Sequence, residues 1–448
     1  MSNSSSKADH ICVLVHGLWG NPSHLDQVAS ALRERHGDQL HVFSAKENSG
    51  NYTYDGIELG GERLAHEIEE TVDALKEQGQ EIKKLSVVGY SLGGLVARYA
   101  IGLLEAQGWL DKVEAVNFTT FASPHVGVRA PLKGWRGKFW NVMGARTVSV
   151  SGQQLFMVDS FRDTGRPLLS ILADPDSIFI KGLKRFQTRS AYANIVNDRT
   201  TAFYTTALSK VDPFRDLDKI NINYVDGYEQ VIIDPHVYLL PSTTAEAESA
   251  ALNACEKHKA FAKDAPFWML ILLLIGPVST LFLINSAIQT FRSQRRIKLH
   301  GEGKNGLRFG RYKVPFLIRD AQYALEEAFE KVNNRQEPAY LSSSDAEQSD
   351  ASTAEFSKSS SPSKPDKGTQ SSETFHAANS TQNHPKLALT PDQFAIIDSL
   401  NDVGFTKYPV HIHNHRHSHA AIIVRSPKDG FYEGKIVIKH WLDQEFVI

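Results

Sequence analysis

The chain has 448 residues, which is long for one domain but within the range of an α/β sheet that carries insertions. Its 49 lysines and arginines nearly balance its 51 aspartates and glutamates, so no overall positive field favours a nucleic-acid partner. The two cysteines, Cys12 and Cys255, argue against a disulfide framework and favour a reducing compartment. The polar start, MSNSSSKADH, lacks the apolar stretch of a signal peptide.

From residue 11 to about residue 124, predicted strands and helices alternate. The segments in chain order are ICVLVH, HLDQVASALRERH, HVFSAK, GGERLAHEIEETVDALKEQ, LSVVG with the helical pattern that follows it, and VEAVNFTTFASPH. This alternation predicts the α/β class: a mostly parallel sheet with right-handed crossovers and helices on both faces.

The segment LSVVGYSLGGLVARY, from Leu85 to Tyr99, has the pattern of a nucleophile elbow. A buried strand enters Gly-Tyr-Ser-Leu-Gly, and a helix leaves it. The two glycines permit a sharp turn because they bring no Cβ into the junction. This predicts Ser91 as a nucleophile; the alternative is an ordinary strand-to-helix turn that carries a surface serine.

A second glycine turn, His16-Gly17-Leu18-Trp19-Gly20, ends the first predicted strand. A backbone N–H from such a loop can stabilise an oxyanion, together with the amide of the residue after the nucleophile. We therefore predict an oxyanion hole formed by the amides of Leu18 and Leu92.

The stretch from Val128 to Phe186 interrupts the alternation and contains Trp135, Phe139 and Trp140 among basic residues. Two interpretations are open. The stretch is either a surface helix pair or a lid whose aromatic and basic residues settle at a lipid surface.

Pro266–Ile288 contains no charged residue and is long enough to span a bilayer. A basic cluster follows it directly: Arg292, Arg295, Arg296 and Lys298. Gly276-Pro277 lies at its midpoint and permits a hairpin instead of a single span. The alternative to a membrane segment is a buried helix of a soluble protein.

The serine-rich stretch 342–386 has few large apolar residues and is predicted to be a disordered linker. Apolar periodicity returns beyond it. We therefore divide the chain into a hydrolase core with a lid region at 1–240, a hydrophobic membrane segment at 266–288, the linker, and a carboxy-terminal part of the hydrolase domain at 387–448.

An activated serine needs a histidine to take its proton and a carboxylate to orient that histidine. In this fold class the acid follows the serine and the histidine comes last. Asp198 fits best because it follows the apolar run AYANIV, although an Asn-Asp pair is more often a turn. Asp212 and Asp226 are weaker candidates.

The last segment offers five histidines at every second position, from His411 to His419. On a strand they would share one face, which raises a metal site as one interpretation and a histidine-rich surface strand as the more common one. His419 is favoured as the base because it directly precedes the apolar run AAIIVR; His415 and His417 are runners-up. No metal is predicted.

The position of the base constrains the apolar segment. Ser91 precedes Pro266–Ile288 and His419 follows it, yet the two side chains must meet. If His419 is the base, the segment must enter and leave the membrane by one face; if the segment is a single span, the base must be His236 or His258.

Several stretches together resemble the fungal serine esterase and lipase family of the α/β-hydrolase superfamily, its lipid-droplet phospholipases in particular. They are VLVHGLWGN, YDGIELGGER, LSVVGYSLGGLVARY, FASPHVGV, YANIVNDRTTAFYT and the terminal HAAIIVR. The resemblance implies an α/β-hydrolase with Ser91 as nucleophile, Asp198 as acid and His419 as base. It also implies hydrolysis of glycerophospholipid acyl esters at a lipid droplet.

We therefore expect a membrane-associated serine hydrolase that needs no cofactor and acts on a phospholipid or neutral lipid. The expected location is the lipid droplet, or else the endoplasmic reticulum or another intracellular membrane, with the catalytic domain facing the cytosol. The alternatives are a triacylglycerol lipase, an acyl-protein esterase, or a catalytically inactive hydrolase fold that serves as a membrane scaffold.

Overall fold

We describe the protein from a computed structural model, which covers residues 8–129, 149–198, 200–240, 288, 290–299, 340 and 384–448. The apolar stretch up to residue 287, the serine-rich stretch up to residue 383, and Trp135, Phe139 and Trp140 of the predicted lid lie outside these described residues. Among the helices that are described, none combines the length and hydropathy of a membrane span.

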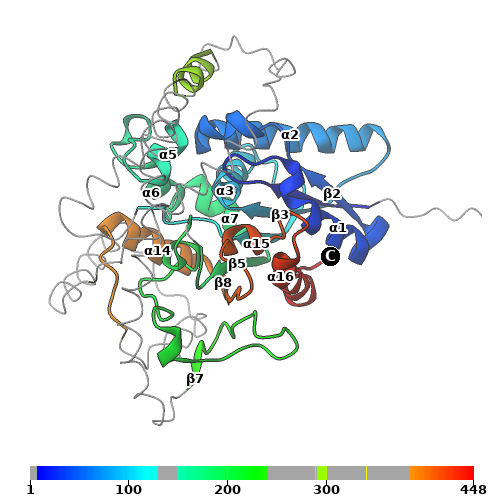
Figure 1. The fold of residues 1–448 in the computed structure, drawn as a ribbon. Coiled ribbons are helices and arrows are strands. Elements are labelled where there is room, and N and C mark those ends of the chain that lie inside the picture. Colours follow the sequence, from blue (N-terminus) through cyan, green and yellow to red (C-terminus); the bar gives the residue numbers. More distant parts are fainter. Residues whose placement is uncertain are drawn as a thin grey trace, which may run out of the picture.

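A six-stranded parallel sheet forms the centre of the molecule, with strand order β2-β1-β3-β4-β5-β8 (Figure 1). The strands are β1 (His10–Val15), β2 (Leu40–Ser44), β3 (Lys84–Tyr90), β4 (Glu114–Phe121), β5 (Thr188–Asn194) and β8 (Thr406–Val410). A separate antiparallel pair is formed by β6 (Asn221–Ile222) and β7 (Leu239–Leu240). The α/β fold class expected from the alternation of strands and helices is confirmed.

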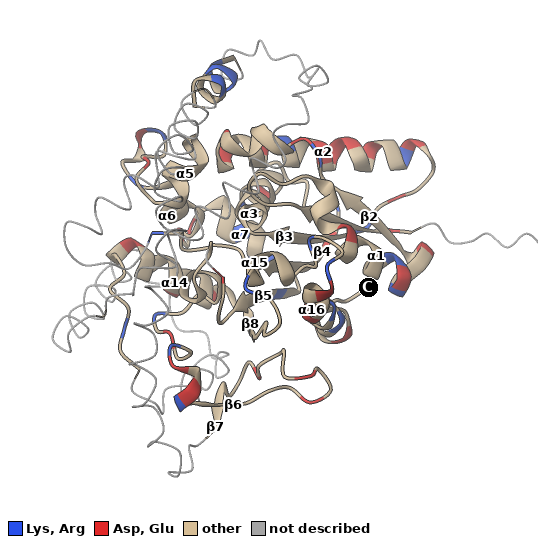
Figure 2. Cartoon of the chain, in the orientation of Figure 1, with Lys and Arg blue, Asp and Glu red and all other residues tan. Residues whose placement is uncertain are grey.

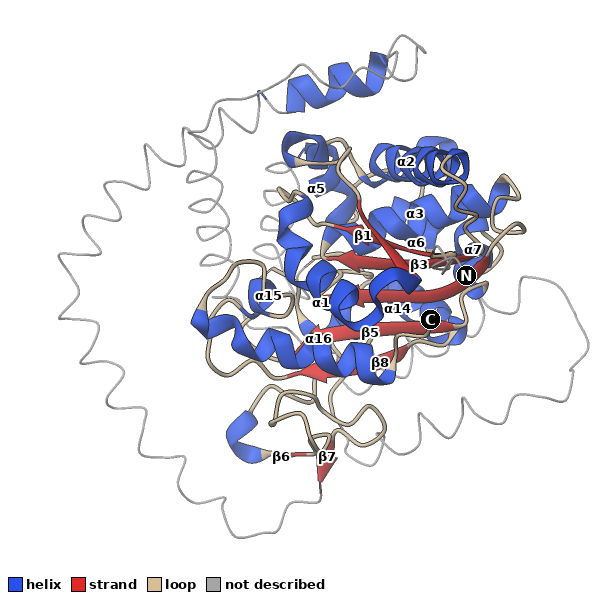
Figure 3. Ribbon diagram, turned by 90° about the vertical axis from the view of Figure 1, so that its right-hand side faces the viewer, coloured by secondary structure: helices blue, strands red, loops and turns tan. Residues whose placement is uncertain are grey.

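Both faces of the sheet are covered by helices, as Figure 3 shows. Along β1, Ile11 and Val13 pack into one hydrophobic core while Cys12 and Leu14 pack into the other. This is because successive side chains of a strand point to opposite faces. On the first face lie α2 (Ile57–Glu77), α3 (Leu92–Ala106), α6 (Leu168–Leu172), α7 (Ile178–Lys184) and α14 (Pro391–Val403); on the second lie α1 (Asp26–His36) and α16 (Tyr432–Gln444). Three shorter helices are α5 (Ser149–Leu155), α8 (Phe203–Thr206) and α15 (Ser418–Ala421), and residues 290–299 are also helical.

The carboxy-terminal part of the chain completes the same sheet. In the parallel pairing of β8 with β5, Ser190 lies opposite Thr406 and Asn194 lies opposite Val410. The segments that follow these two strands therefore leave the sheet at the same edge, although more than 200 residues separate them in the sequence.

The alternating histidines do not lie on a strand, so that expectation is wrong. β8 ends at Val410, and His411–His417 forms a loop before α15. The reason is that the loop finds partners outside the sheet: the His411 N–H donates to the Val231 carbonyl, and the His413 N–H donates to the Glu433 carboxylate.

The two described helices of the stretch 128–186 differ in their surroundings, so neither a surface helix pair nor a lid describes the whole stretch. Helix α7 belongs to the core, because it packs closely along α3: a Cβ at Gly102 would lie 2.2 Å from the Phe179 ring. Helix α5, by contrast, lies beside the pocket described below.

Candidate active site

Ser91 stands at a strained turn between β3 and α3, with φ +54° and ψ −127°. A non-glycine residue rarely adopts a positive φ, and such strain is typical of a nucleophile elbow. The flanking glycines are required by contact. A Cβ at Gly89 would lie 2.4 Å from Gly94 Cα, and one at Gly93 would lie 2.2 Å from the Val15 carbonyl oxygen.

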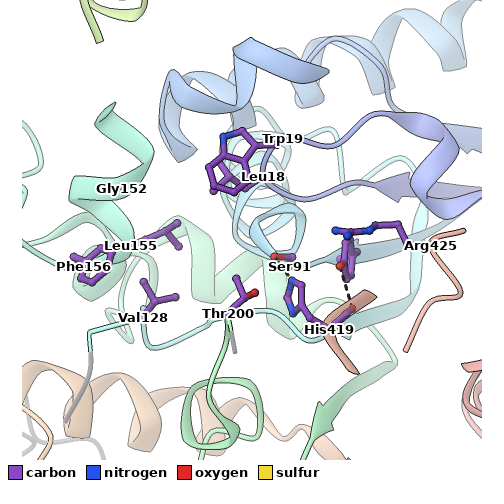
Figure 4. Close-up of a pocket in the computed structure, with 11 residues that line it drawn as sticks. Leu18, Trp19, Ser91, Val128, Gly152, Leu155, Phe156, Thr200, His419 and Arg425 are labelled. Atoms are coloured by element: carbon purple, nitrogen blue, oxygen red, sulfur yellow. Dashed lines mark hydrogen bonds between the residues drawn. The ribbon is translucent and has the colours of Figure 1, made fainter. Parts of the chain in front are cut away.

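The structure brings Ser91, Asp198 and His419 together in one buried chain of contacts. The Ser91 Oγ and His419 Nε2 atoms are 3.0 Å apart, and His419 Nδ1 lies 2.9 Å from Asp198 Oδ2. Figure 4 shows the His419 ring directed toward Ser91. The three residues come from the end of β3, the loop after β5 and helix α15, so parallel strand order places them at one edge of the sheet.

The Asp198 carboxylate is surrounded by donors. Its Oδ1 accepts from the backbone N–H groups of Thr200, at 3.1 Å, and Thr201, at 2.8 Å. Its Oδ2 accepts from His419, from the Asn194 amide at 2.9 Å and from the Thr201 hydroxyl at 3.0 Å. Burial by itself raises the pKa of Asp198, but the His419 charge and these hydrogen bonds outweigh it and hold the pKa below its ordinary value.

The His419 ring is held from several sides. The Tyr90 hydroxyl donates to the His419 carbonyl oxygen at 3.0 Å, and the Tyr90 ring lies 5.1 Å from the imidazole. The Thr201 Oγ1 atom also lies 3.2 Å from His419 Nδ1. Helix α15 also packs closely against α16. Gly434 lies so near the Ala421 carbonyl that no larger residue fits there.

The weaker candidates lie in other surroundings. The Asp212 carboxylate accepts from the Phe214 N–H in its own turn, and the ring of His415 packs edge-on against Phe431. The remaining alternatives are Asp226 and His236, which are exposed, His417, which is half-buried with its N–H donating to His415 Nδ1, and His258, which lies outside the described residues.

The histidine loop contacts side chains of other segments. No group of three or more histidine, cysteine, aspartate or glutamate side chains with metal-ligand geometry occurs among the described residues. His411 Nδ1 lies 2.6 Å from the Tyr224 hydroxyl, and His413 Nδ1 lies 3.0 Å from Glu433. These two contacts hold the loop against Tyr224 and helix α16.

The loop after β1 lies directly over the nucleophile. A Cβ at Gly17 would be 2.7 Å from Ser91 Cβ, so glycine permits this approach. Leu18 lines the same pocket as Ser91, and Leu92 is the first residue of α3, whose amino-terminal end favours negative charge. The backbone N–H of Trp19 donates to the Thr53 hydroxyl oxygen at 3.0 Å. The oxyanion role of the Leu18 and Leu92 amides stays a prediction.

The pocket beside Ser91 is largely apolar (Figure 4). Its described lining is Leu18, Trp19, Tyr90, Ser91, Val128, Gly152, Leu155, Phe156, Thr200, His419 and Arg425. Helix α5 contributes one wall, and two of its side chains hold it to the start of α2. Ser151 Oγ accepts from the Gly56 N–H at 3.0 Å, and Gln154 Oε1 accepts from the Ile57 N–H.

Reasoning from the sequence missed Thr201, Asn194, Arg425 and the contribution of α5. One signal for Thr201 was present, because an aspartate followed by two polar residues at the start of a turn accepts backbone N–H groups two and three positions on. Asp198 therefore both closes a turn, through Oδ1, and contacts His419, through Oδ2.

Comparison with known proteins gives a consistent result. Residues 5–211 match the family model described as "Putative serine esterase (DUF676)". "Putative lipase ROG1" of Saccharomyces cerevisiae is 32% identical over 213 residues, which is 46% of this chain and 29% of that protein. "Putative lipase C4A8.10" of Schizosaccharomyces pombe is 25% identical over 274 residues, which is 58% of this chain and 34% of that protein. The matched part therefore spans about a third of the length of these relatives.

Among solved structures, a lipase-esterase related protein from Clostridium acetobutylicum overlaps with 42% of this chain and 76% of its own, at 13% identity and a TM-score of 0.23. An α/β hydrolase fold protein from Nakamurella multipartita overlaps with 40% of this chain and 61% of its own, at 18% identity and a TM-score of 0.20.

Proposed function

Since residues 5–211 match the family model described as "Putative serine esterase (DUF676)", we propose that this chain hydrolyses acyl esters of glycerophospholipids at a lipid surface by a serine-dependent mechanism. The observation that carries the proposal is the contact chain from Ser91 through His419 to Asp198, which lies beside a pocket lined mainly by apolar side chains.

The chemistry follows from that geometry. Ser91 Oγ attacks the ester carbonyl while His419 Nε2 takes the hydroxyl proton, and Asp198 holds the other ring nitrogen protonated. The amides of Leu18 and Leu92 stabilise the oxyanion. His419 then returns the proton to the leaving alcohol, which departs as a lysophospholipid. Water, activated by the same histidine, releases the fatty acid and restores Ser91.

The apolar wall suits an acyl chain. Val128, Leu155 and Phe156 lie together on one side of Ser91 in Figure 4. Each methylene group that such a wall removes from water contributes about 0.8 kcal/mol to binding. A long-chain ester is therefore favoured over a short polar one.

The helical residues 290–299 supply a surface for lipid. Their inner side is bound to the hydrolase domain: Ser293 is buried, and Arg296 Nε donates to Asp55 Oδ2 at 2.9 Å. Their outer side exposes 69% of Phe291 together with the basic residues Arg292 and Arg295. Figure 2 shows this basic helix at the top of the molecule, beyond α5. An apolar residue among basic ones is suited to an anionic lipid surface.

The apolar stretch Pro266–Ile288 is the second part of the proposed lipid contact. β7 precedes the stretch and packs through Leu239 against the hydrophobic cluster that contains Ala193 of β5. Residues 290–299 follow it and are held to Asp55 through Arg296. Both ends of the stretch are therefore attached to the same domain. We propose that the stretch inserts into lipid and returns to the side from which it started. A lipid-droplet monolayer, which has one polar face, suits such an anchor, and so does the cytosolic leaflet of the endoplasmic reticulum.

The test of the reaction uses droplets that contain both phospholipid and triacylglycerol, with products resolved by mass spectrometry. Wild type should release fatty acid and lysophospholipid, and Ser91→Ala should release neither. Ser23→Ala, which changes an exposed serine, is the matched control and should behave as wild type. Serine-dependent diacylglycerol without lysophospholipid would instead identify a triacylglycerol lipase, and equal products from wild type and Ser91→Ala would indicate a scaffold.

The test of the lipid surface measures vesicle binding. Vesicles of phosphatidylcholine alone and with phosphatidylserine are sedimented with wild type, with Arg292→Glu/Arg295→Glu, and with Lys112→Glu/Lys181→Glu. The last variant changes net charge equally at exposed positions elsewhere. At about 1 kcal/mol per basic residue near an anionic surface, the first variant should lose about tenfold or more of its preference for phosphatidylserine. Equal losses in the two variants would refute this surface.

A further inference from the structure

Arg425 is the one lysine, arginine, aspartate or glutamate among the described residues that line the pocket. It is half-buried, and the proposed mechanism does not use it. A cation in a largely apolar pocket is an unusual lining for the site of a neutral ester, because the ester group carries no charge to attract it.

The pocket has two chemically different sides. Figure 4 shows Leu155, Phe156 and Val128 on one side of Ser91 and Arg425 on the opposite side. Ser91 and His419 lie between them. A substrate that places its ester carbonyl at Ser91 and its acyl chain on the apolar wall therefore directs its alcohol part toward Arg425.

The base and the cation are carried by one rigid segment. The backbone N–H of Arg425 donates to the Ala420 carbonyl oxygen at 3.0 Å, so the chain closes a tight turn just after His419. Val424 adopts a positive φ of 52° in this turn, and Ile423 before it is completely buried. The backbone at Arg425 is thus placed by the same packing that places His419.

We propose that Arg425 binds the phosphodiester of the glycerophospholipid headgroup, so that the site selects acyl esters whose alcohol part carries a phosphate. This inference rests on the proposed function. In a glycerophospholipid only the short glycerol backbone separates the ester from the phosphate, which matches a cation on the far side of the nucleophile. A guanidinium is well suited to this role because its planar set of N–H groups donates two parallel hydrogen bonds to phosphate oxygens.

The experiment compares two substrates that carry the same acyl esters, dioctanoylphosphatidylcholine and dioctanoylglycerol, in the same mixed micelles. For Arg425→Gln we expect kcat/KM toward the phospholipid to fall about tenfold to a hundredfold, mainly through KM, because a charge-assisted hydrogen bond is lost. Toward dioctanoylglycerol the change should stay below about threefold. Arg425→Lys should recover part of the phospholipid activity, since it restores the charge without the two parallel bonds.

Lys428→Gln is the matched control, because it removes one exposed positive charge from the same loop and should leave the ratio of the two substrates unchanged. Thermal unfolding of each variant is followed by circular dichroism to show that it is folded. Equal losses toward both substrates, or none toward either, would overturn the role of Arg425. A wild type that hydrolyses dioctanoylglycerol but not the phospholipid would overturn the proposed function itself, and with it this inference.

Discussion

Replacing Asp198 with asparagine tests the contact chain most sharply, because the change keeps the shape of the side chain and alters only its charge and donors. Oδ1 of the carboxylate accepts from two backbone N–H groups, of Thr200 and Thr201, which cannot rotate away. An asparagine therefore keeps its carbonyl oxygen there and turns its NH2 group toward His419 Nδ1. That ring nitrogen must then accept a hydrogen bond, so the proton of the neutral imidazole moves to Nε2. Nε2 lies 3.0 Å from the Ser91 Oγ and, once protonated, cannot take the hydroxyl proton.

The expected loss is large. In a serine protease the same exchange leaves the geometry intact and lowers kcat about 10⁴-fold through the wrong tautomer. At about 1.36 kcal/mol for each factor of ten, this corresponds to about 5.5 kcal/mol of transition-state stabilisation. We expect a loss of this order for Asp198→Asn.

The assay is hydrolysis of a soluble p-nitrophenyl ester, which needs no lipid surface, with circular dichroism to confirm folding. Asn194→Ala is the control: it removes one donor, 2.9 Å from the same carboxylate oxygen, but keeps the charge and the tautomer. Activity should fall about tenfold, the lower end of the range for one hydrogen bond to a charged group, because the N–H groups of Thr200 and Thr201 and the Thr201 hydroxyl still donate to the carboxylate. An Asp198→Asn variant that is folded and retains more than about a hundredth of wild-type activity would refute the assignment of Asp198 as the orienting acid.

Three further predictions concern the frame around the site. Gly93→Ala should destabilise the protein by about 1–3 kcal/mol in urea unfolding and lower esterase activity, because its Cβ would lie 2.2 Å from the Val15 carbonyl; a variant of unchanged stability would contradict this contact. Asp55→Asn should lower the free energy of unfolding by about 3–5 kcal/mol, because the Asp55 side chain is completely buried between Arg63 and Arg296. Arg296→Gln should lower it by only about 1 kcal/mol in the same assay, because the Arg296 side chain is 21% exposed. A larger loss for Arg296→Gln than for Asp55→Asn would contradict this packing. Burial raises the pKa of Glu67 to about 7 from an ordinary 4.5, so the folded state binds a proton more tightly than the unfolded chain and stability should fall as pH rises from about 5 to 7. Glu67→Gln should flatten this dependence when Tm is measured against pH, and an equally steep curve would show that another group is responsible.

The local sequence accounts for the elements near the nucleophile. The apolar run of β3 and the helical pattern of α3 are both evident in the printed letters, and Gly89 is required by a contact with Gly94, a few residues along the chain. Gly93 is different, because the atom its Cβ would meet belongs to Val15, on a neighbouring strand. Such features can be predicted because strand and helix periods and the need for a turn without Cβ atoms are short-range properties. The parallel sheet follows from the same alternation.

The residues that contact Ser91 could not be identified from local sequence alone. Asp198 and His419 could be ranked among several candidates, but the order of residues along the chain does not say which carboxylate or imidazole will be adjacent. That is decided when β8 pairs with β5, since this pairing brings the loop before His419 to the edge where Asp198 leaves the sheet. The histidine pattern was misleading for the same reason, because partners from distant segments end the strand at Val410.

The sequence by itself determined the α/β architecture, the strained turn at Ser91 and the apolar segment, since each depends on the types and spacing of neighbouring residues. Only the tertiary structure decided that Asp198 and His419 meet Ser91, that α5 forms a wall of the pocket and that Arg425 lies opposite that wall (Figure 4). The physical reason is that these contacts join residues up to 328 positions apart. Their formation depends on the packing of the whole sheet and its helices, which no local pattern records.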